Sequence, residues 1–365
     1  MKIGILTFHD TTNFGSTLQA FALEYAIYRL NYNCEIINYQ CESIIHREFL
    51  PKFVFWKMGW KQMILWVLLM PVQKKKHKNI NKFFENYGKV SKKSYTKETI
   101  KDTLDQYDKF IVGSDLVWNP GITGSDITYF LSFVDKKRKK YAFSSSIGEK
   151  WKEDKEEEFA EYLKGFERIA VREKDSAEYI SKLIGRKVDW VADPTMLLEA
   201  DEWRKYQLKK DKFRRGKIKF VLVYFTDNKG KVLKDAKAYA EKYGCKVYMI
   251  HYGIKKYSQI KNIKPTSVEE FLSLIDNAEC VFTASYHGML FSLYFNKEFW
   301  FYNRNYCTRM VSLSEAFNVA HRNGELMGID NSKIRWAEVN NKINKFRKYS
   351  LDILEEMLQQ HGKNL

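Results

Sequence analysis

Short hydrophobic runs alternate with longer stretches of mixed polarity over the first 200 residues of the chain. A helix is predicted over residues 16–30, because the apolar side chains at 18, 21, 22 and 25 recur on one helical face. The short apolar runs predict buried strands at residues 2–8, 34–39, 110–112, 141–144 and 169–171. Since parallel strands need crossover connections, this alternation predicts a mostly parallel sheet with helices on both faces.

A second series of strands and helices follows the charged stretch 202–217, which is the predicted linker. Its strands are expected at 220–225, 246–251, 280–284 and 299–302. Its helices are expected at 231–243, 268–275 and 289–295, with Thr266 or Ser267 and Glu269 or Glu270 capping the second. We therefore predict an N-terminal α/β domain over 1–200, a C-terminal α/β domain over 201–335 and a helical tail over 336–365.

The turn Ser285-Tyr286-His287-Gly288 joins a β-prone apolar run to an apolar stretch of helical length. Such junctions in α/β proteins direct free backbone N–H groups at a ligand. Histidine is the side chain that most readily exchanges a proton near neutral pH, so His287 is a candidate acid–base group. On this motif alone, a buried histidine at the start of a core helix fits equally well.

Polar residues also follow the predicted strands of the first half. One group stands at the start of the first helix and offers amide and backbone donors: Asn13, Gly15 and Ser16. A second follows the strand at 110–112 and offers a carboxylate for sugar hydroxyls and an aromatic face for a ring: Ser114, Asp115, Trp118 and Asn119. Asp115 could instead cap a helix. Asp193 is expected to fix the turn before Pro194.

Arg172 leaves the predicted strand at 169–171, at the carboxyl end where ligands collect in parallel sheets. A guanidinium can hold a phosphate or a carboxylate through two parallel hydrogen bonds. The alternative is a surface arginine paired with Glu173 or Asp175. Arg304 and Arg309 follow the strand at 299–302 and could supply a second cation.

Composition narrows the class of protein. The 365 residues are 45% hydrophobic with only 5 prolines, which predicts a globular chain long enough for two cores. The five cysteines are scattered without a CxxC pair, which disfavours a disulfide framework or a structural zinc site and suits a reducing cytoplasm. No signal peptide is expected, because the chain enters a strand at once. The net charge of +17 favours anionic partners, although no nucleic-acid-binding motif is present.

The segment 49–84 departs from this pattern, with eight lysines and no acidic residue. As a helix its middle part would align Phe53, Trp56, Trp60, Met63 and Val67 on one side. Its apolar run is too short to cross a bilayer, which needs about 20 apolar residues. The aromatic side and the basic run 74–78 favour a helix that lies on an anionic membrane surface through residues 53–78. The alternatives are an insertion packed on the first domain or a wall of the acceptor cleft.

Five further motifs, in this order, accompany the Ser-Tyr-His-Gly turn: the segment from Lys2 to Ser16, Phe110 to Asn119, Tyr141 to Gly148, Val171 to Asp175, and Ala192 to Thr195. Together they resemble the polysaccharide pyruvyl transferase family from Lys2 to about Arg309. The resemblance implies two Rossmann-like α/β domains facing a cleft, similar to the B-type glycosyltransferase fold. It also implies phosphoenolpyruvate as donor and a sugar of a surface glycan as acceptor.

This chemistry needs an acid for the enol carbon, cations for the carboxylate and phosphate, and a base for the sugar hydroxyl. We assign His287 to the acid–base role, and Arg172 to the donor with Ser285, Gly288, Arg304 and Arg309. Relatives often carry arginine where this chain has Ser285, so Arg304 or Arg309 would replace that cation. The first domain would hold the sugar, and neither a metal nor another cofactor is required.

The leading hypothesis is therefore a pyruvyl transferase that forms a ketal on a hexose of a lipid-linked capsular or exopolysaccharide precursor. The enzyme would be cytoplasmic and peripheral to the inner membrane face. One alternative is a glycosyltransferase with a nucleotide-sugar donor, since one fold hosts both activities. Another is a basic, membrane-associated scaffold of a polysaccharide assembly complex. The sequence does not name the acceptor sugar, the ketal positions, the ketal stereochemistry or the oligomeric state.

Overall fold

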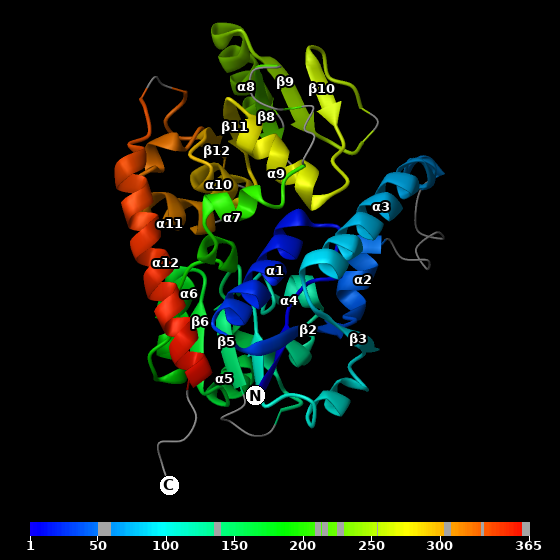
Figure 1. Ribbon diagram of the computed structural model, residues 1–365, viewed down its shortest axis with the longest axis vertical. Coiled ribbons are helices and arrows are strands. Elements are labelled where there is room, and N and C mark those ends of the chain that lie inside the picture. Colours follow the sequence, from blue (N-terminus) through cyan, green and yellow to red (C-terminus); the bar gives the residue numbers. More distant parts are fainter. Residues whose placement is uncertain are drawn as a thin grey trace. The chain divides into compact units, whose positions relative to one another are not determined.

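A computed structural model describes residues 1–49, 60–134, 140–208, 213, 218–224, 230–253, 255–302, 308–329 and 332–359 of the chain (Figure 1). The chain divides into two compact units. The first comprises Met1–Val54, Asn81–Leu198 and Lys345–Leu365, and the second comprises Phe55–Ile80 and Glu199–Asn344. The first unit is thus assembled from three separate stretches of sequence.

The first unit is built on a seven-stranded parallel sheet with the order β3-β2-β1-β4-β5-β6-β7. The strands are β1 (Lys2–Leu6), β2 (Asn33–Tyr39), β3 (Val90–Tyr95), β4 (Lys109–Val112), β5 (Lys140–Ser145), β6 (Arg168–Val171) and β7 (Asp189–Trp190). The central strands β4 and β5 are buried along their whole length, as the continuous apolar runs predict.

Helices connect these strands: α1 (Phe14–Arg29), α2 (Glu42–Phe49), α4 (Pro120–Thr123), α5 (Glu153–Lys164) and α6 (Lys174–Ile184). The pattern predicted one apolar face for α1, but the structure buries this helix almost all round. Its neighbours include the sheet and the short 3-10 turn Pro194–Leu197. Even Gln19 and Glu24 are therefore enclosed.

The second unit contains a five-stranded parallel sheet with the order β10-β9-β8-β11-β12. Its strands are β8 (Phe220–Tyr224), β9 (Lys246–Ile250), β10 (Ile260–Ile263), β11 (Cys280–Thr283) and β12 (Glu298–Phe301). Its helices are α7 (Ala200–Arg204), α8 (Gly230–Tyr243), α9 (Val268–Asn277), α10 (Tyr286–Tyr294) and α11 (Thr308–Ala316). Ser267 caps α9 by accepting from the Glu270 N–H, which confirms the predicted capping residues.

The tail forms a single helix, α12 (Trp336–Gln359). Its last part packs on the first unit, where Ser350 accepts a hydrogen bond from the Ala192 N–H and Arg347 donates to the Met196 carbonyl oxygen. Lys109, which is fully buried, donates to the carbonyl oxygens of Met357 and Leu358 at the carboxyl end of α12. The tail is thus an integral part of the first core.

The basic segment forms a 28-residue helix, α3 (Trp60–Tyr87), with Pro71 inside it. Of the predicted aromatic side, Phe53 and Trp56 lie outside the described residues, as do the side chains of Trp60 and Met63. Val67 and Leu68 are 51% and 56% exposed, and Lys74, Lys75 and Lys78 are exposed as well. Lys76 differs, because it is buried with its ammonium 4.4 Å from the ring centre of Tyr252. No helix in the described part of the chain is long and apolar enough to cross a membrane.

Candidate functional site

Each sheet reverses its strand order at one point. In the first unit the reversal lies between β1 and β4, and in the second between β8 and β11. Ligands of parallel α/β sheets bind beyond the carboxyl ends of the strands at such reversals, because the connecting loops diverge there. The polar turns predicted from the sequence follow these strands: 7–16 and 113–119 in the first unit, and 284–288 in the second.

The second unit's turn is tied to its reversal by Thr283. The Thr283 hydroxyl donates to the Tyr224 carbonyl oxygen at 2.7 Å, which links the ends of β11 and β8, and it accepts from the Ser285 N–H at 3.0 Å. Ser285 is the N-cap of α10 and accepts from the Gly288 N–H. Gly288 is required here, because a Cβ at this position would lie 2.4 Å from Thr283 Oγ1.

His287 occupies the first turn of α10 and is 8% exposed. Its ring lies edge-on to Tyr286, with the ring centres 5.5 Å apart. Arg309, at the start of α11, places its guanidinium 6.0 Å from the ring centre of Tyr286. The structure thus brings a histidine and a cation next to Tyr286, whereas Arg304 lies outside the described residues.

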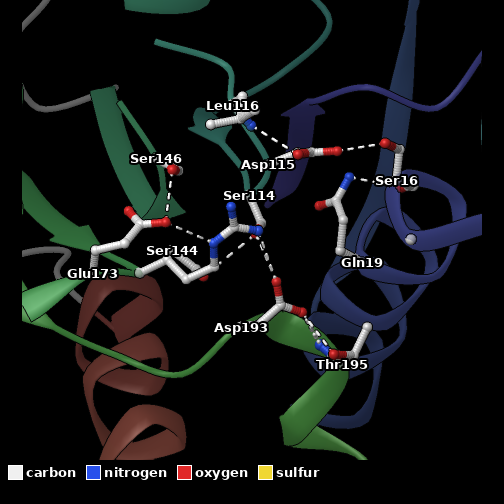
Figure 2. A network of polar contacts seen from close by, with 12 residues as sticks. Ser16, Gln19, Ser114, Asp115, Leu116, Ser144, Ser146, Glu173, Asp193 and Thr195 are labelled. Atoms are coloured by element: carbon white, nitrogen blue, oxygen red, sulfur yellow. Dashed lines mark hydrogen bonds and ion pairs between the residues drawn. The ribbon is translucent and has the colours of Figure 1, made fainter. Parts of the chain in front are cut away.

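The first unit's reversal is occupied by the start of α1 and the loop after β4. Asn13 caps α1, accepting from the Gly15 N–H at 2.9 Å. Ser16 donates to a carboxylate oxygen of Asp115, and the other oxygen of that carboxylate accepts from the Leu116 N–H (Figure 2). Four of the predicted acceptor residues, Asn13, Gly15, Ser16 and Asp115, therefore lie at the β1/β4 reversal.

Asp115 has a φ of 72°, a left-handed conformation that is uncommon for residues other than glycine. Its carbonyl oxygen accepts from the Ser146 N–H, so the loop after β4 is fastened to the end of β5. Ser144, on β5, also has a positive φ of 59°. Strained backbone of this kind persists where the surrounding contacts over-determine it, and it is concentrated at functional sites.

Arg172 lies in the interior of the first unit, with its side chain only 1% exposed. Its Nε donates to Glu173 and its Nη1 to Asp193, both at 3.1 Å. Ser146 donates to the same oxygen of Glu173, and Ser114 donates to the same oxygen of Asp193 (Figure 2). The arrangement is neither the predicted surface pair nor an open anion clamp.

The Arg172 guanidinium is therefore already paired with carboxylates of the protein. Holding an anionic donor there would require one of these ion pairs to open, and the donor role stays a prediction. Asp193 also accepts from the N–H and the hydroxyl of Thr195 and so fixes the turn at Pro194, as predicted.

Trp118 corrects one expectation. Its ring is 1% exposed and stacks on Phe130 with the ring centres 5.6 Å apart, and its indole N–H donates to the Tyr129 carbonyl oxygen. A ring enclosed in the core offers no face to a sugar. Asn119 donates to the Ile147 carbonyl oxygen and thereby joins two loops.

Two polar residues of the site were not predicted from the sequence. Gln19 is fully buried and donates to the Phe8 and Ser16 carbonyl oxygens, so it orders the loop before α1. Glu173 was considered only as a surface partner of Arg172, but it is buried between Arg172 and Ser146. For Gln19, the available signal in the sequence was its position as a lone glutamine inside the apolar stretch of α1. In the described part of the chain, no cluster of three His, Cys, Asp or Glu residues could hold a metal ion.

Comparison with solved structures places the fold. The UDP-GlcNAc 2-epimerase of Neisseria meningitidis, bound to UDP-GlcNAc, matches with a TM-score of 0.51 at 10% identity over 99% of this chain and 100% of that chain. A glycosyltransferase of Rickettsia africae matches with a TM-score of 0.52 at 10% identity over 99% of both chains. At such identity the likeness concerns the fold alone. It confirms the predicted class of two Rossmann-like units similar to B-type glycosyltransferases.

Sequence comparison gives the family. No curated protein matches the sequence. The family model for polysaccharide pyruvyl transferase matches residues 13–306, a range that begins at the cap of α1 and includes β4, the reversal between β8 and β11 and the Ser-Tyr-His-Gly turn. Because this match spans most of the 365 residues, the chain belongs to the polysaccharide pyruvyl transferase family.

Proposed function

We propose that the protein transfers pyruvate from phosphoenolpyruvate to a hexose of a lipid-linked capsular or exopolysaccharide precursor, where it forms a cyclic ketal. The observation that carries the proposal is the position of His287, in the first turn of α10 and beside the reversal between β8 and β11. An ionisable side chain at that point suits acid–base chemistry on a bound ligand. The family match supplies the reaction class.

The reaction needs one proton delivered and two removed. Protonation of C3 of phosphoenolpyruvate gives a methyl group and an electrophilic C2. The first sugar hydroxyl adds to C2 and loses its proton, and the C2–O bond to phosphate then breaks. The second hydroxyl adds to the same carbon, and its proton leaves with the phosphate. The products are the pyruvate ketal and inorganic phosphate.

One histidine can serve the first two transfers. His287 in its protonated form donates to C3, and the resulting neutral imidazole accepts the proton of the attacking hydroxyl. Because His287 is protonated again after these two transfers, the two steps need no additional acid or base. General acid–base assistance of this kind is typically worth about 100- to 10,000-fold in rate.

The donor carries a phosphate and a carboxylate, which require positive partners. The amino end of α10 carries a partial positive charge and lies at the turn that contains Ser285 and Gly288. In the second unit, Arg309 is a nearby cation, because its guanidinium lies close to the ring of Tyr286. We further assign Arg304 to donor binding from its position in the sequence, and Arg172 remains a candidate that its ion pairs would have to release.

The acceptor is assigned to the first unit. Asn13, Ser16 and Asp115 provide an amide, a hydroxyl and a carboxylate at the β1/β4 reversal, and such groups form the hydrogen bonds that sugar hydroxyls require. Ser114 and Asn119 act by holding the loops that carry them. Gly15 follows the cap and allows a close approach to the backbone.

A glycosyltransferase with a nucleotide-sugar donor is the second candidate, because the fold is shared with a glycosyltransferase. The two activities release different products. A pyruvyl transferase releases inorganic phosphate from phosphoenolpyruvate, whereas a glycosyltransferase releases a nucleotide from its donor.

The test is phosphate release from phosphoenolpyruvate in the presence of membrane lipid extracts as a source of lipid-linked acceptors, together with mass spectrometry of the glycan. We expect a pyruvate ketal in the product and a loss of at least about 100-fold in rate for His287→Ala. The matched control is His46→Ala, because His46 is exposed on α2 and outside both reversals. Nucleotide release without phosphate release would favour the second candidate, and a normal rate for His287→Ala would remove this residue from the acid–base role.

A further inference from the structure

A cavity of about 670 Å³ lies in the first unit, beside the turn 7–16. It is formed by the loop after β1, the strands β2 and β3, and the last turns of α3. A volume in this range is typical of small-molecule sites. Its lining includes His9, Asp10, Asn38, Gln40, Glu85 and Lys92.

The floor of the cavity is a chain of hydrogen bonds. His9 is buried, and its Nε2 lies 3.2 Å from Asn38 Oδ1. Gln40 donates to the same oxygen at 2.7 Å. Two contacts to one oxygen fix the orientation of the Asn38 amide. Within the described residues, Asn38 Nδ2 and Gln40 Oε1 have no protein partner, so one donor and one acceptor remain for a ligand.

The wall of the cavity is shaped by an irregularity in the sheet. Ile36 pairs with Val90 and Asn38 pairs with Ser94, so three residues of β3, 91–93, stand opposite the single residue Ile37 of β2. The Ser91 hydroxyl replaces the missing ladder contact by accepting from the Asn38 N–H at 3.0 Å. Bulges of this kind redirect side chains and are frequent beside binding sites. Here the bulge brings Lys92 to the cavity.

The charge of the lining is unlike that of the whole protein. The lining carries three carboxylates, those of Asp10, Glu35 and Glu85, and two ammonium groups, those of Lys89 and Lys92, while Glu35 is paired with the Lys2 ammonium at 2.7 Å. The chain as a whole carries +17. An anionic ligand would therefore meet no excess of positive groups, whereas amides, carboxylates and an imidazole together suit the mixed donors and acceptors of a polyol.

We propose that this cavity binds an uncharged sugar residue of the acceptor glycan, next to the hexose that receives pyruvate. The proposal rests on the proposed function for the identity of the glycan. It assigns Asn38 and Gln40 as sugar-binding residues that take no part in the proton transfers.

The test is direct binding, by saturation-transfer NMR, of the methyl glycosides of glucose, galactose, mannose and N-acetylglucosamine to the full-length protein without phosphoenolpyruvate. We expect at least one of them to bind, and Gln40→Ala to weaken that binding about fivefold, as expected for one lost hydrogen bond and a released Asn38 amide. The control is Gln106→Ala, since Gln106 is a hydrogen-bonded glutamine of the same unit that does not line the cavity. Glucose 6-phosphate should bind more weakly than methyl glucoside.

The outcomes separate this inference from the proposed function. If no glycoside binds, if Gln40→Ala and Gln106→Ala behave alike, or if glucose 6-phosphate binds best, the cavity is not an uncharged-sugar site. If a glycoside binds through Gln40 but turnover releases a nucleotide, the inference holds and the pyruvyl transfer fails. In active enzyme, Gln40→Ala should raise KM for the acceptor about fivefold and leave kcat unchanged.

Discussion

At the scale of single residues, the polar side chains of the first unit are engaged with one another. Ser16 is bound to Asp115, and Arg172 is bound to Glu173 and Asp193. Sequence reasoning located these residues at strand ends, because strand ends can be inferred from hydrophobic runs. It named Glu173 as a possible surface partner of Arg172, but it could not give Asp193 as the second partner or pair Ser16 with Asp115, which lies 99 positions away. Such pairs depend on which strands are neighbours, and hydrophobic periodicity does not encode that order.

Substitution of Arg172 distinguishes its two possible roles. Arg172→Met would leave Glu173 and Asp193 buried without their cation, and the free energy of unfolding should fall by about 3–5 kcal/mol. Arg172→Lys keeps the charge but loses the fork that serves both carboxylates, so it should be intermediate. Denaturant unfolding and steady-state kinetics provide the measurements. An Arg172→Lys enzyme of normal stability with a raised KM for phosphoenolpyruvate would instead identify a donor clamp.

The raised pKa of Glu24 makes the stability of the protein depend on pH. Burial in α1 raises the pKa of this carboxyl to about 7 from an unperturbed value of 4.5, and Lys89 offsets this effect in part. The folded protein therefore holds a proton that the unfolded chain releases, and its stability falls as pH rises from 4.5 through 7. Glu24→Gln removes this effect and should stabilise the protein at pH 8 by up to about 3 kcal/mol.

The measurement for Glu24 is thermal unfolding of both proteins between pH 5 and 8. The advantage of Glu24→Gln over the natural protein should be small at pH 5 and should grow as pH rises. A difference that does not change with pH would show that Glu24 has an ordinary pKa in the folded state.

At the scale of elements, the strands that sequence reasoning identified are the apolar ones, most of them central, with β12 an apolar strand at the edge of its sheet. It did not identify the two-residue strand β7, nor β3 and β10, which stand at the edges of their sheets. Their sequences, Val-Ser-Lys-Lys-Ser-Tyr and Ile-Lys-Asn-Ile, are polar because an edge strand is exposed and because lysines there discourage pairing with other chains. Because β3 lines the sugar cavity proposed above, the hydrophobic pattern of the sequence did not indicate this cavity.

The predicted binding to an anionic membrane surface concerns helix α3. Val67, Leu68, Lys74, Lys75 and Lys78 are exposed on it, which suits an anionic lipid surface, whereas the buried Lys76 contributes to protein packing. Each exposed lysine near such a surface is worth roughly 1 kcal/mol. Replacing Lys74, Lys75 and Lys78 with glutamate should therefore weaken co-sedimentation with phosphatidylserine-containing vesicles at least tenfold.

The matched control for α3 replaces Lys255, Lys256 and Lys261 with glutamate, because these lysines are also exposed and the change in net charge is the same. Binding of the natural protein should fall as salt rises. Equal loss in both triple variants would mean that net charge, and not α3, attracts the vesicles. No binding of the natural protein at low salt would remove the membrane contact altogether.

At the scale of the whole molecule, the two series of strands and helices could be read from the sequence because each is long and regular. The strand orders could not, although they decide where the polar turns lie. Thr283 illustrates the difference: it is an ordinary strand residue in the sequence, and its bond to the Tyr224 carbonyl oxygen exists only because β11 is placed beside β8. The division of the first unit into three stretches of sequence was likewise beyond local patterns.

That division has a consequence for synthesis on the ribosome. Residues 199–344 of the second unit form one continuous stretch, but the first unit needs the end of α12, where the Met357 and Leu358 carbonyl oxygens receive the buried ammonium of Lys109. Until those residues emerge, Lys109 lacks its partners and the core around it is incomplete. Domains generally fold in the order of their synthesis, yet here the unit that emerges first is the one that must wait, and its nascent sheet has the longest exposure to chaperones.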